Sequence, residues 1–67
     1  MKFVLNGEVR ESQAPLTVAE LLVAYDLGAR RVAVAINGEV VPKSRRAAVK
    51  VGDGDKVEVI QAVGGGA

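Results

Sequence analysis

Residues 61–67 read QAVGGGA, and the three consecutive glycines are the part of the sequence best suited to a chemical role. A glycine run has no Cβ atoms, so it can enter a slot in which any side chain would collide, and its amides can bond to the slot walls. The residues beyond Val63, fully extended, reach about 13 Å at roughly 3.3 Å each. We therefore interpret residues 64–67 as a flexible tail that presents a carboxylate to a buried site in another protein, and residues 1–63 as the domain that carries it. The alternative is an ordinary frayed chain end.

Other residue types that carry chemistry are scarce. The sequence has no histidine and no cysteine, which excludes an imidazole base, a thiol nucleophile, a disulfide and a good zinc site. The acidic residues are scattered at turns and solvent faces, and VGDGD at residues 51–55 lacks the remaining ligands of a calcium loop, so we interpret it as a β-turn. No glycine-rich loop leads into a helix to hold a nucleotide. We expect a protein that is not an enzyme and that binds no metal or cofactor itself.

The charge distribution argues against nucleic acid as a partner. Nine basic and eight acidic residues give a formal net charge of +1, and only one tyrosine and one phenylalanine could stack on bases. The largest local excess of charge is a basic cluster of Lys43, Arg45, Arg46 and Lys50. This cluster is either a solvated connection or a patch that steers an acidic partner surface, with an effect on association rate that weakens with salt.

The start of the chain, MKFVLNGEVR, bears on localisation. It turns polar after three apolar residues, which is too soon for the apolar region of a signal peptide, and no later run approaches a membrane span. We therefore expect a cytoplasmic protein that does not contact the membrane.

Two hairpins are expected from their turn sequences. Asn6-Gly7 separates strands at residues 2–5 and 8–12, and Asn37-Gly38 lies within a second hairpin at residues 31–42. Both residues of an Asn-Gly pair accept the positive φ angles of a tight type I′ turn. The sequence therefore predicts two pairs of antiparallel strands.

One helix is expected between the hairpins. Thr17 precedes Glu20 by three residues, which is the spacing of a capping box at a helix start. The apolar residues that follow share one helical face: Val18, Leu21, Leu22 and Tyr25. Gly28 suits the left-handed position just beyond a helix end. The pattern predicts a helix over residues 18–26.

The remainder is a polar connection and a last strand. Residues 43–55 are mostly connection, with a short helical or 3₁₀ turn at 44–49 and a β-turn at 52–55. The strand at 56–63 has apolar side chains on both faces, as strands inside a sheet do. One short helix covers only one face of a four- or five-stranded sheet, so we expect an α+β roll whose other face is open to a partner.

Partner docking is assigned to two groups of residues. Arg45 and Arg46 belong to the basic cluster, and Val57 and Val59, with their neighbours, belong to the last strand. We expect both groups to contribute to docking.

Several stretches, taken in order, resemble one known family. The chain begins MKFVLNGE, continues with TVAELL and VAVAINGEVVP, and ends with GDKVEVIQAVGGG before its last residue. In these stretches it is similar, over essentially its whole length, to the ThiS family of sulfur carriers from thiamine biosynthesis, whose fold is the ubiquitin-like β-grasp. The resemblance implies a mixed sheet with the first and last strands parallel and central, and with one main helix on one face.

The resemblance also implies a chemistry at the tail. A ThiF-type, E1-like adenylyltransferase would use ATP to adenylate the carboxylate of Gly66. A sulfur-donating enzyme would then supply the sulfur of a thiocarboxylate, which a ThiG-type thiazole synthase would receive. Gly64 and Gly65 would be the clearance residues behind the reactive end. The chain itself would be a co-substrate of these enzymes.

Ala67 departs from the family, which ends in Gly-Gly. We expect a peptidase to remove it; otherwise it is an added or tolerated terminus, or its own carboxylate is used. The last option requires a narrow glycine slot to accept a methyl group.

Two alternative functions follow from the same features. A related β-grasp carrier could serve molybdopterin synthesis, thiolate tRNA or conjugate to lysines as a ubiquitin-like modifier. In a different class, the chain could be a β-grasp interaction module with an inert tail, which would still function after deletion of residues 64–67.

Overall fold

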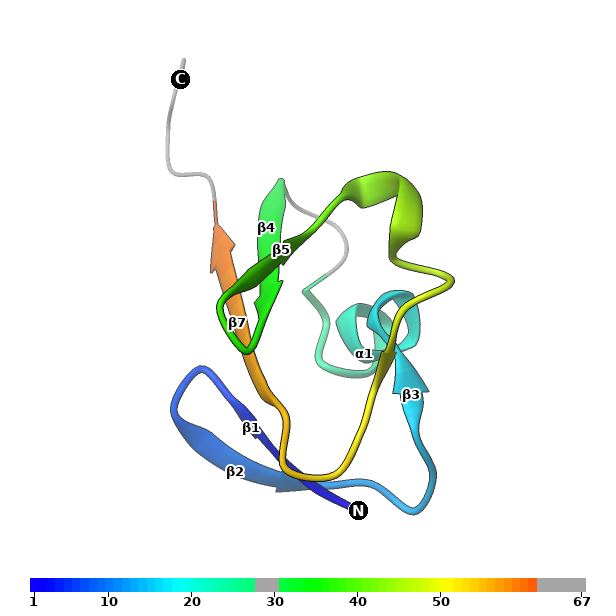
Figure 1. Cartoon of the computed structure of the whole chain (residues 1–67), viewed down its shortest axis with the longest axis vertical. Coiled ribbons are helices and arrows are strands. Elements are labelled where there is room, and N and C mark those ends of the chain that lie inside the picture. Colours follow the sequence, from blue (N-terminus) through cyan, green and yellow to red (C-terminus); the bar gives the residue numbers. More distant parts are fainter. Residues whose placement is uncertain (28–30, 62–67) are drawn as a thin grey trace.

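A mixed sheet of five strands forms one layer of the molecule, in the order β2-β1-β7-β4-β5 (Figure 1). The computed structural model describes residues 1–27 and 31–61. β1 and β7 are parallel and every other neighbouring pair is antiparallel. The strands are β1 (Lys2–Leu5), β2 (Glu8–Glu11), β4 (Val32–Ile36), β5 (Glu39–Val41) and β7 (Lys56–Gln61). The expected β-grasp sheet, with β7 at its centre, is confirmed.

Both hairpins close as their turn sequences predict. Asn6 and Gly7 have φ angles of 50° and 83°, and Asn37 and Gly38 have 51° and 84°. Positive φ at both central residues is the geometry whose twist matches that of the flanking strands. The two turns therefore have nearly the same backbone conformation at different places in the sheet.

Helix α1 (Val18–Ala24) begins where the capping box predicts and ends earlier than expected. Glu20 N donates to Thr17 Oγ1 at 3.0 Å, and Thr17 N donates to Glu20 Oε1 at 2.8 Å. At the other end Asp26 has a φ of 57°, and Leu27 N donates to the carbonyl of Leu22 at 2.7 Å. Asp26 thus takes the left-handed position that the sequence suggested for Gly28, which lies outside the described residues.

The connection before β7 contains a short strand, β6, whose pairing with a strand just before α1 the sequence analysis did not predict. β3 (Leu16–Thr17) pairs in antiparallel fashion with β6 (Lys50–Val51). A 3₁₀ turn at Lys43–Arg45 precedes β6, close to the helical turn expected there. The carbonyls of Val49 and Arg46 accept from the first helical amides, Val18 N at 2.9 Å and Ala19 N at 3.0 Å. The connection therefore completes the N-terminal cap of α1.

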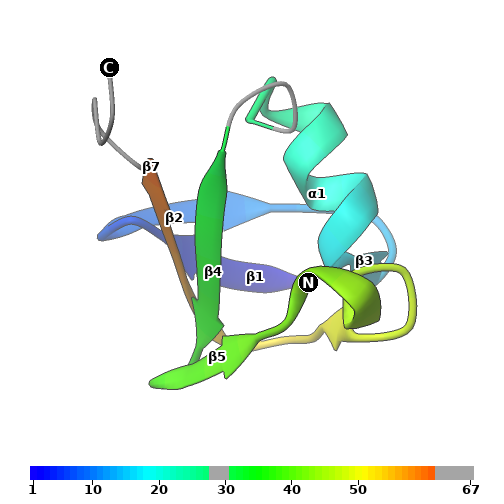
Figure 2. The ribbon, with the colours of Figure 1, turned by 90° about the horizontal axis from the view of Figure 1, so that it is seen from above.

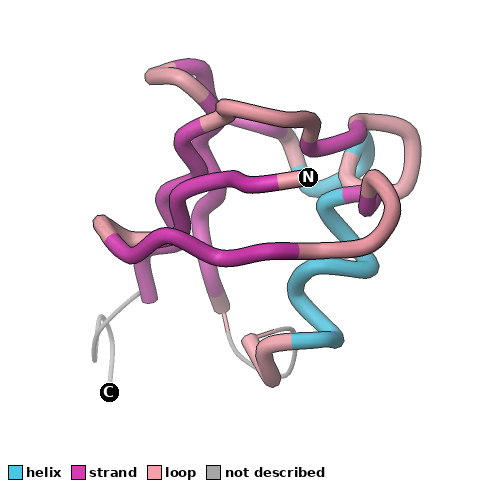
Figure 3. Tube along the Cα trace, turned by 90° about the horizontal axis from the view of Figure 1, so that it is seen from below, coloured by secondary structure: helices cyan, strands magenta, loops and turns pink. Residues whose placement is uncertain are grey.

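The core lies between α1 and one face of the sheet (Figures 2 and 3). Its side chains come from the helix, the strands and the connection: Phe3, Leu5, Val18, Leu21, Leu22, Val34, Val41, Val51, Val57 and Val59. The views show no described element over the other face of the sheet, which is thus the open face expected from the sequence. Within residues 1–27 and 31–61, no helix is both long and apolar enough to span a membrane.

Candidate functional site

The site starts at the end of β7, because the predicted reactive residues follow it in the sequence. Gly64, Gly65, Gly66 and Ala67 all lie outside the described residues. β7 ends at Gln61, whose neighbour across the antiparallel pair is Val32 at the start of β4. The described part of the site therefore consists of the hydrogen bonds that hold β7 in the sheet and of the protein surface around that strand.

Two asparagine side chains fasten β7 from opposite sides. Val59 N donates to Asn6 Oδ1 at 2.8 Å, and Lys56 N donates to Asn37 Oδ1 at 3.0 Å. The backbone amides of the same two asparagines donate to β7 carbonyls, Asn6 N to Val57 and Asn37 N to Lys56. Asn6 thus extends the pairing of β1 with β7 by one residue, and Asn37 extends the pairing of β4 with β7 in the same manner. Sequence analysis missed this role, because Asn-Gly is already explained by the turn itself.

The two valines assigned to docking are core residues. Val57 is 1% exposed and Val59 is 8% exposed, whereas Ile60 on the same strand is 63% exposed. Side chains alternate between faces along a strand, so Glu58 and Ile60 occupy the open face while the two valines face α1. Val57 and Val59, expected at the docking surface, are therefore buried in the core, and it is their neighbours Glu58 and Ile60 that lie on the open face.

The open face has an apolar surface at its centre and edges. Ile60 lies opposite Ala33, and Ala35 lies opposite the exposed Val40 of edge strand β5. On β2, at the other edge, Val9 is exposed as well. Directly opposed residues in an antiparallel pair share a face, so Ile60 lies beside Ala33 and Val40 beside Ala35, whereas Val9 lies beside Val4, nearer the start of β7. We call Val9, Val40 and Ile60 the open-face residues.

The two arginines of the basic cluster have different roles. Arg46 is half-buried, and its Nη2 donates to the carbonyl of Val32. On the side of β4 away from β7, the pairing with β5 ends at Val34 and Val41, so β5 has no residue opposite Val32, and the guanidinium of Arg46 binds the Val32 carbonyl. Arg45 is exposed, and its side chain has no hydrogen bond or ion pair to the rest of the described chain. Arg45 therefore remains suited to steering a partner, whereas Arg46 ties the connection to the sheet.

The carboxylates of residues 1–27 and 31–61 form no metal site, and one of them, Glu20, has a shifted pKa. Residues 1–27 and 31–61 hold no group of three or more potential metal ligands. Hydrogen bonds from the backbone and the hydroxyl of Thr17 lower the pKa of Glu20, with a smaller contribution from Lys50. This carboxylate already serves as the helix cap, so its shifted titration has a structural cause.

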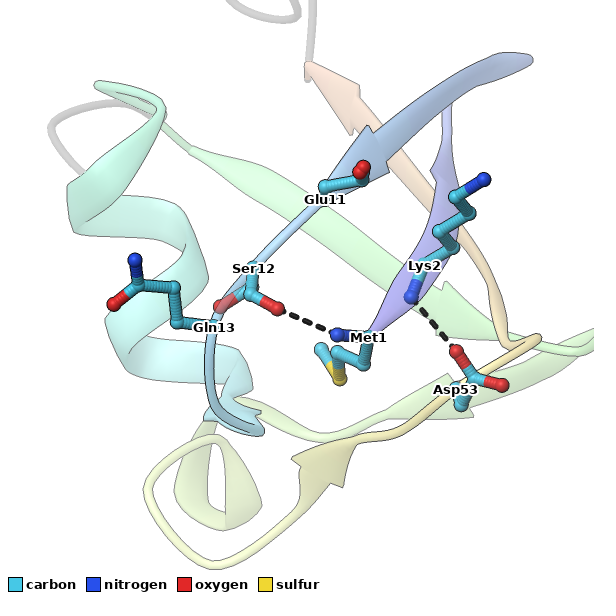
Figure 4. A pocket seen from close by; sticks show the side chains of 6 residues that line it. All are labelled: Met1, Lys2, Glu11, Ser12, Gln13 and Asp53. Carbon is cyan, nitrogen blue, oxygen red and sulfur yellow. Dashed lines mark hydrogen bonds between the residues drawn. The ribbon is translucent and has the colours of Figure 1, made fainter.

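A hollow of about 490 Å³ lies at the N-terminal end of β1, lined by Met1, Lys2, Glu11, Ser12, Gln13 and Asp53 (Figure 4). The amino group of Met1 donates to the carbonyl of Ser12 at 2.6 Å, and Lys2 N donates to Asp53 Oδ1 at 2.7 Å. Figure 1 places this end of the sheet away from the end of β7. The hollow is therefore separate from the predicted tail site, and these polar groups already have partners within the fold.

The ThiS family model matches residues 3–66. A thiazole synthase from Paramagnetospirillum magneticum is 50% identical over 66 residues, which are 98% of this chain and 20% of that protein. This chain thus spans about one fifth of that relative. The sulfur carrier protein ThiS of Escherichia coli is 35% identical over 98% of this chain and 100% of its own length. The crystal structure of the thiamine biosynthesis protein ThiS from Geobacter metallireducens matches with a TM-score of 0.86 and 37% identity, over 97% of this chain and 99% of that one.

Proposed function

The chain belongs to the ThiS family, and on that premise we propose that it is a sulfur carrier in thiamine biosynthesis. The observation that supports this most directly is the match to the Escherichia coli sulfur carrier protein ThiS over the full length of that protein. The fold supports this as well, because it matches the crystal structure of the Geobacter metallireducens ThiS with a TM-score of 0.86.

The proposed reaction takes place at the carboxylate of Gly66, after removal of Ala67. A carboxylate is a poor electrophile, so an adenylyltransferase joins it to the AMP portion of ATP and releases pyrophosphate. Hydrosulfide released by a sulfur-donating enzyme then attacks the acyl carbon, expels AMP and loses its proton, which leaves a thiocarboxylate at Gly66. Thiazole synthase transfers the sulfur to its product, an oxygen from its substrate or from water replaces the sulfur on the acyl carbon, and the carboxylate is regenerated for another cycle. Gly64 and Gly65 let the backbone enter both enzymes without side-chain collisions.

The proposed docking surface for these enzymes is the open face. Val9, Val40 and Ile60 are exposed apolar side chains on a face that no described element covers. A few well-packed side chains near the centre of an interface contribute most of the binding energy once the partner excludes water from them, and Ile60 on the central strand β7 is the candidate here. Arg45 lines a surface hollow together with Val40 of edge strand β5, and its positive charge acts on the association rate.

Thiazole synthase is proposed as one of the partners. The thiazole synthase of Paramagnetospirillum magneticum contains a segment similar to nearly all of this chain, amounting to one fifth of its length. A carrier and the enzyme that consumes its sulfur gain a high effective concentration when they are joined in one protein. That relative therefore supports a partnership between the two activities.

The experiment that tests this function uses a ThiF-type adenylyltransferase, ATP and the carrier prepared with its end at Gly66. We expect carrier-dependent release of pyrophosphate, which a form truncated after Val63 does not support. Ile60→Asp should raise the carrier concentration needed for half-maximal rate by about tenfold or more, as for loss of an interface anchor. Val23→Asp is the matched control, because Val23 is 78% exposed and lies on α1, away from the open face.

Two results would contradict the proposal. Equal pyrophosphate release with the truncated form would show that the tail is not the substrate. Sulfur transfer to the large molybdopterin synthase subunit, with none to thiazole synthase, would instead assign the chain to the related carrier for molybdopterin.

A further inference from the structure

The chain contains the tripeptide Asn-Gly-Glu twice, at residues 6–8 and 37–39. Each copy closes a hairpin, and the φ angles of the two asparagines differ by one degree, 50° against 51°. A difference in reactivity between Asn6 and Asn37 must therefore come from the surroundings of the two side chains, because the local sequence and the turn are matched.

The Asn-Gly sequence is open to a spontaneous reaction of the peptide chain. The backbone nitrogen of glycine attacks the side-chain amide carbon of the preceding asparagine, closes a five-membered succinimide and expels ammonia. Water then opens the ring on either side, which gives aspartate or isoaspartate. Glycine has no side chain to obstruct the attack. In a folded turn the asparagine side chain must first leave its hydrogen-bond partners, because its carbonyl carbon has to swing to the following backbone nitrogen.

The two side chains are held by different numbers of partners. Asn6 Oδ1 accepts from Val59 N, and Asn6 Nδ2 has no hydrogen bond to the rest of the described chain. Asn37 Oδ1 accepts from Lys56 N, and its Nδ2 also donates to Asp55 Oδ1 at 3.1 Å. The other carboxylate oxygen of Asp55 accepts from Gly52 N at 2.8 Å, which fixes the carboxylate in place. Asn37 must therefore break one bond more than Asn6, and that bond is to a charged group.

From this difference we infer that Asn6 is the deamidation site of the folded protein and that Asp55 protects Asn37. The inference does not depend on the carrier function. Aspartate at position 6 keeps an oxygen that can accept from Val59 N. Isoaspartate instead adds a carbon to the backbone of a two-residue turn, which displaces that oxygen and loosens β7 two residues before Gln61.

The test follows both sites in the same protein at neutral pH. Folded protein is sampled over time and digested, and the two Asn-Gly peptides are separated by chromatography and mass spectrometry into asparagine, aspartate and isoaspartate forms. Protein unfolded in urea gives the reference rates, which should be similar at the two sites. In the folded protein we expect Asn6 to react about tenfold faster than Asn37, the factor expected for one hydrogen bond to a charged group.

Two substitutions in one turn identify the cause. Asp55→Ala should raise the rate at Asn37 to that at Asn6 and leave the rate at Asn6 unchanged. Asp53→Ala is the matched control, because Asp53 accepts from Lys2 N and does not contact either asparagine. If Asp55→Ala unfolds the domain, both asparagines of that variant will react at the rates measured in urea. The test then rests on the ratio of the Asn6 rate to the Asn37 rate in the folded, unsubstituted protein.

The inference is overturned if Asn6 and Asn37 react at equal rates in the folded protein, or if Asn37 is faster. It is also overturned if Asn6 stays intact while the urea-unfolded chain is converted. A folded Asp55→Ala variant in which Asn37 remains slow would remove Asp55 as the protecting group.

Discussion

The backbone amide of Val59 donates to the side-chain oxygen of Asn6 across 2.8 Å, although the two residues are 53 positions apart. This bond extends the parallel pairing of β1 and β7 beyond the last strand residue of β1. It lies two residues before the end of β7, where the sequence continues toward the glycines. The turn of the first hairpin therefore helps to hold the strand from which the proposed reactive tail departs.

We expect Asn6→Gly to lower the free energy of unfolding by about 1 to 3 kcal/mol, the usual cost of leaving a buried donor without a partner. Glycine keeps the positive φ of the turn, so the loss reports on the side-chain oxygen. Asn6→Asp is the control, because it keeps an acceptor and should be close to the parent. Urea denaturation measures both, and a glycine variant as stable as the parent would show that the bond contributes nothing.

Leu21→Ala should destabilise the domain by about 2 to 5 kcal/mol, since it removes a fully buried side chain and leaves a cavity. In a protein of this size that loss could exceed the whole stability. Val23→Ala, on the exposed side of the same helix, should change the stability by less than about 0.5 kcal/mol. Thermal and urea unfolding distinguish the two variants, and similar losses in both would contradict the described placement of α1.

Arg46→Ala should lower the free energy of unfolding, whereas Arg45→Ala should leave it nearly unchanged. Removing Arg46 leaves the carbonyl of Val32 without its partner, and we expect a loss of about 1 to 3 kcal/mol. Removing Arg45 should leave stability within about 0.5 kcal/mol of the parent, and urea denaturation measures both variants.

Arg45→Glu should slow association with the adenylyltransferase and reduce the dependence of that rate on salt. Stopped-flow measurements at two salt concentrations check this, and unchanged kinetics would exclude Arg45 as a steering charge.

The capping box should make stability depend on pH. Hydrogen bonds from Thr17 lower the pKa of Glu20 in the folded protein relative to the unfolded chain. The stabilisation by its charged form is therefore present above the pKa of an unfolded glutamate, and it is lost as the pH falls through the lowered folded pKa. Glu20→Gln can still accept from Thr17 N but does not titrate. We expect the variant to lose less stability than the parent in acid unfolding curves; parallel curves would contradict this.

The hairpins and the helix start could be predicted because their signals are local. Asn-Gly sets the φ angles of a turn, and Thr17 with Glu20 sets a cap, wherever the rest of the chain goes. The helix ends two residues earlier than its apolar pattern predicts, because Asp26 takes a left-handed conformation that lets Leu27 pack against the core. The β3–β6 pair was missed for a related reason: two-residue strands have no periodicity to recognise, and the rest of the fold brings them together.

The docking residues could not be predicted, because they depend on which face of β7 the helix covers. The sequence of β7 is apolar on both faces, so its pattern does not say whether Val57 and Val59 or Ile60 lies on the face that the helix covers. The double role of Asn6 depends on β7 lying beside the first turn, which the turn sequence does not encode. Gly64, Gly65 and Gly66 remain predictions from the sequence and the family.

The central claim is that the carboxylate of Gly66 carries the sulfur, and intact-mass spectrometry of the protein from its native host tests it most directly. We expect a form that has lost Ala67 and in which one oxygen of the Gly66 carboxylate is replaced by sulfur. Bulky replacements of Gly65 and Gly66 should abolish this form together with thiazole synthesis. A terminal carboxylate that stays free of sulfur in cells that are making thiazole, or normal thiazole synthesis with both glycines replaced, would contradict the claim.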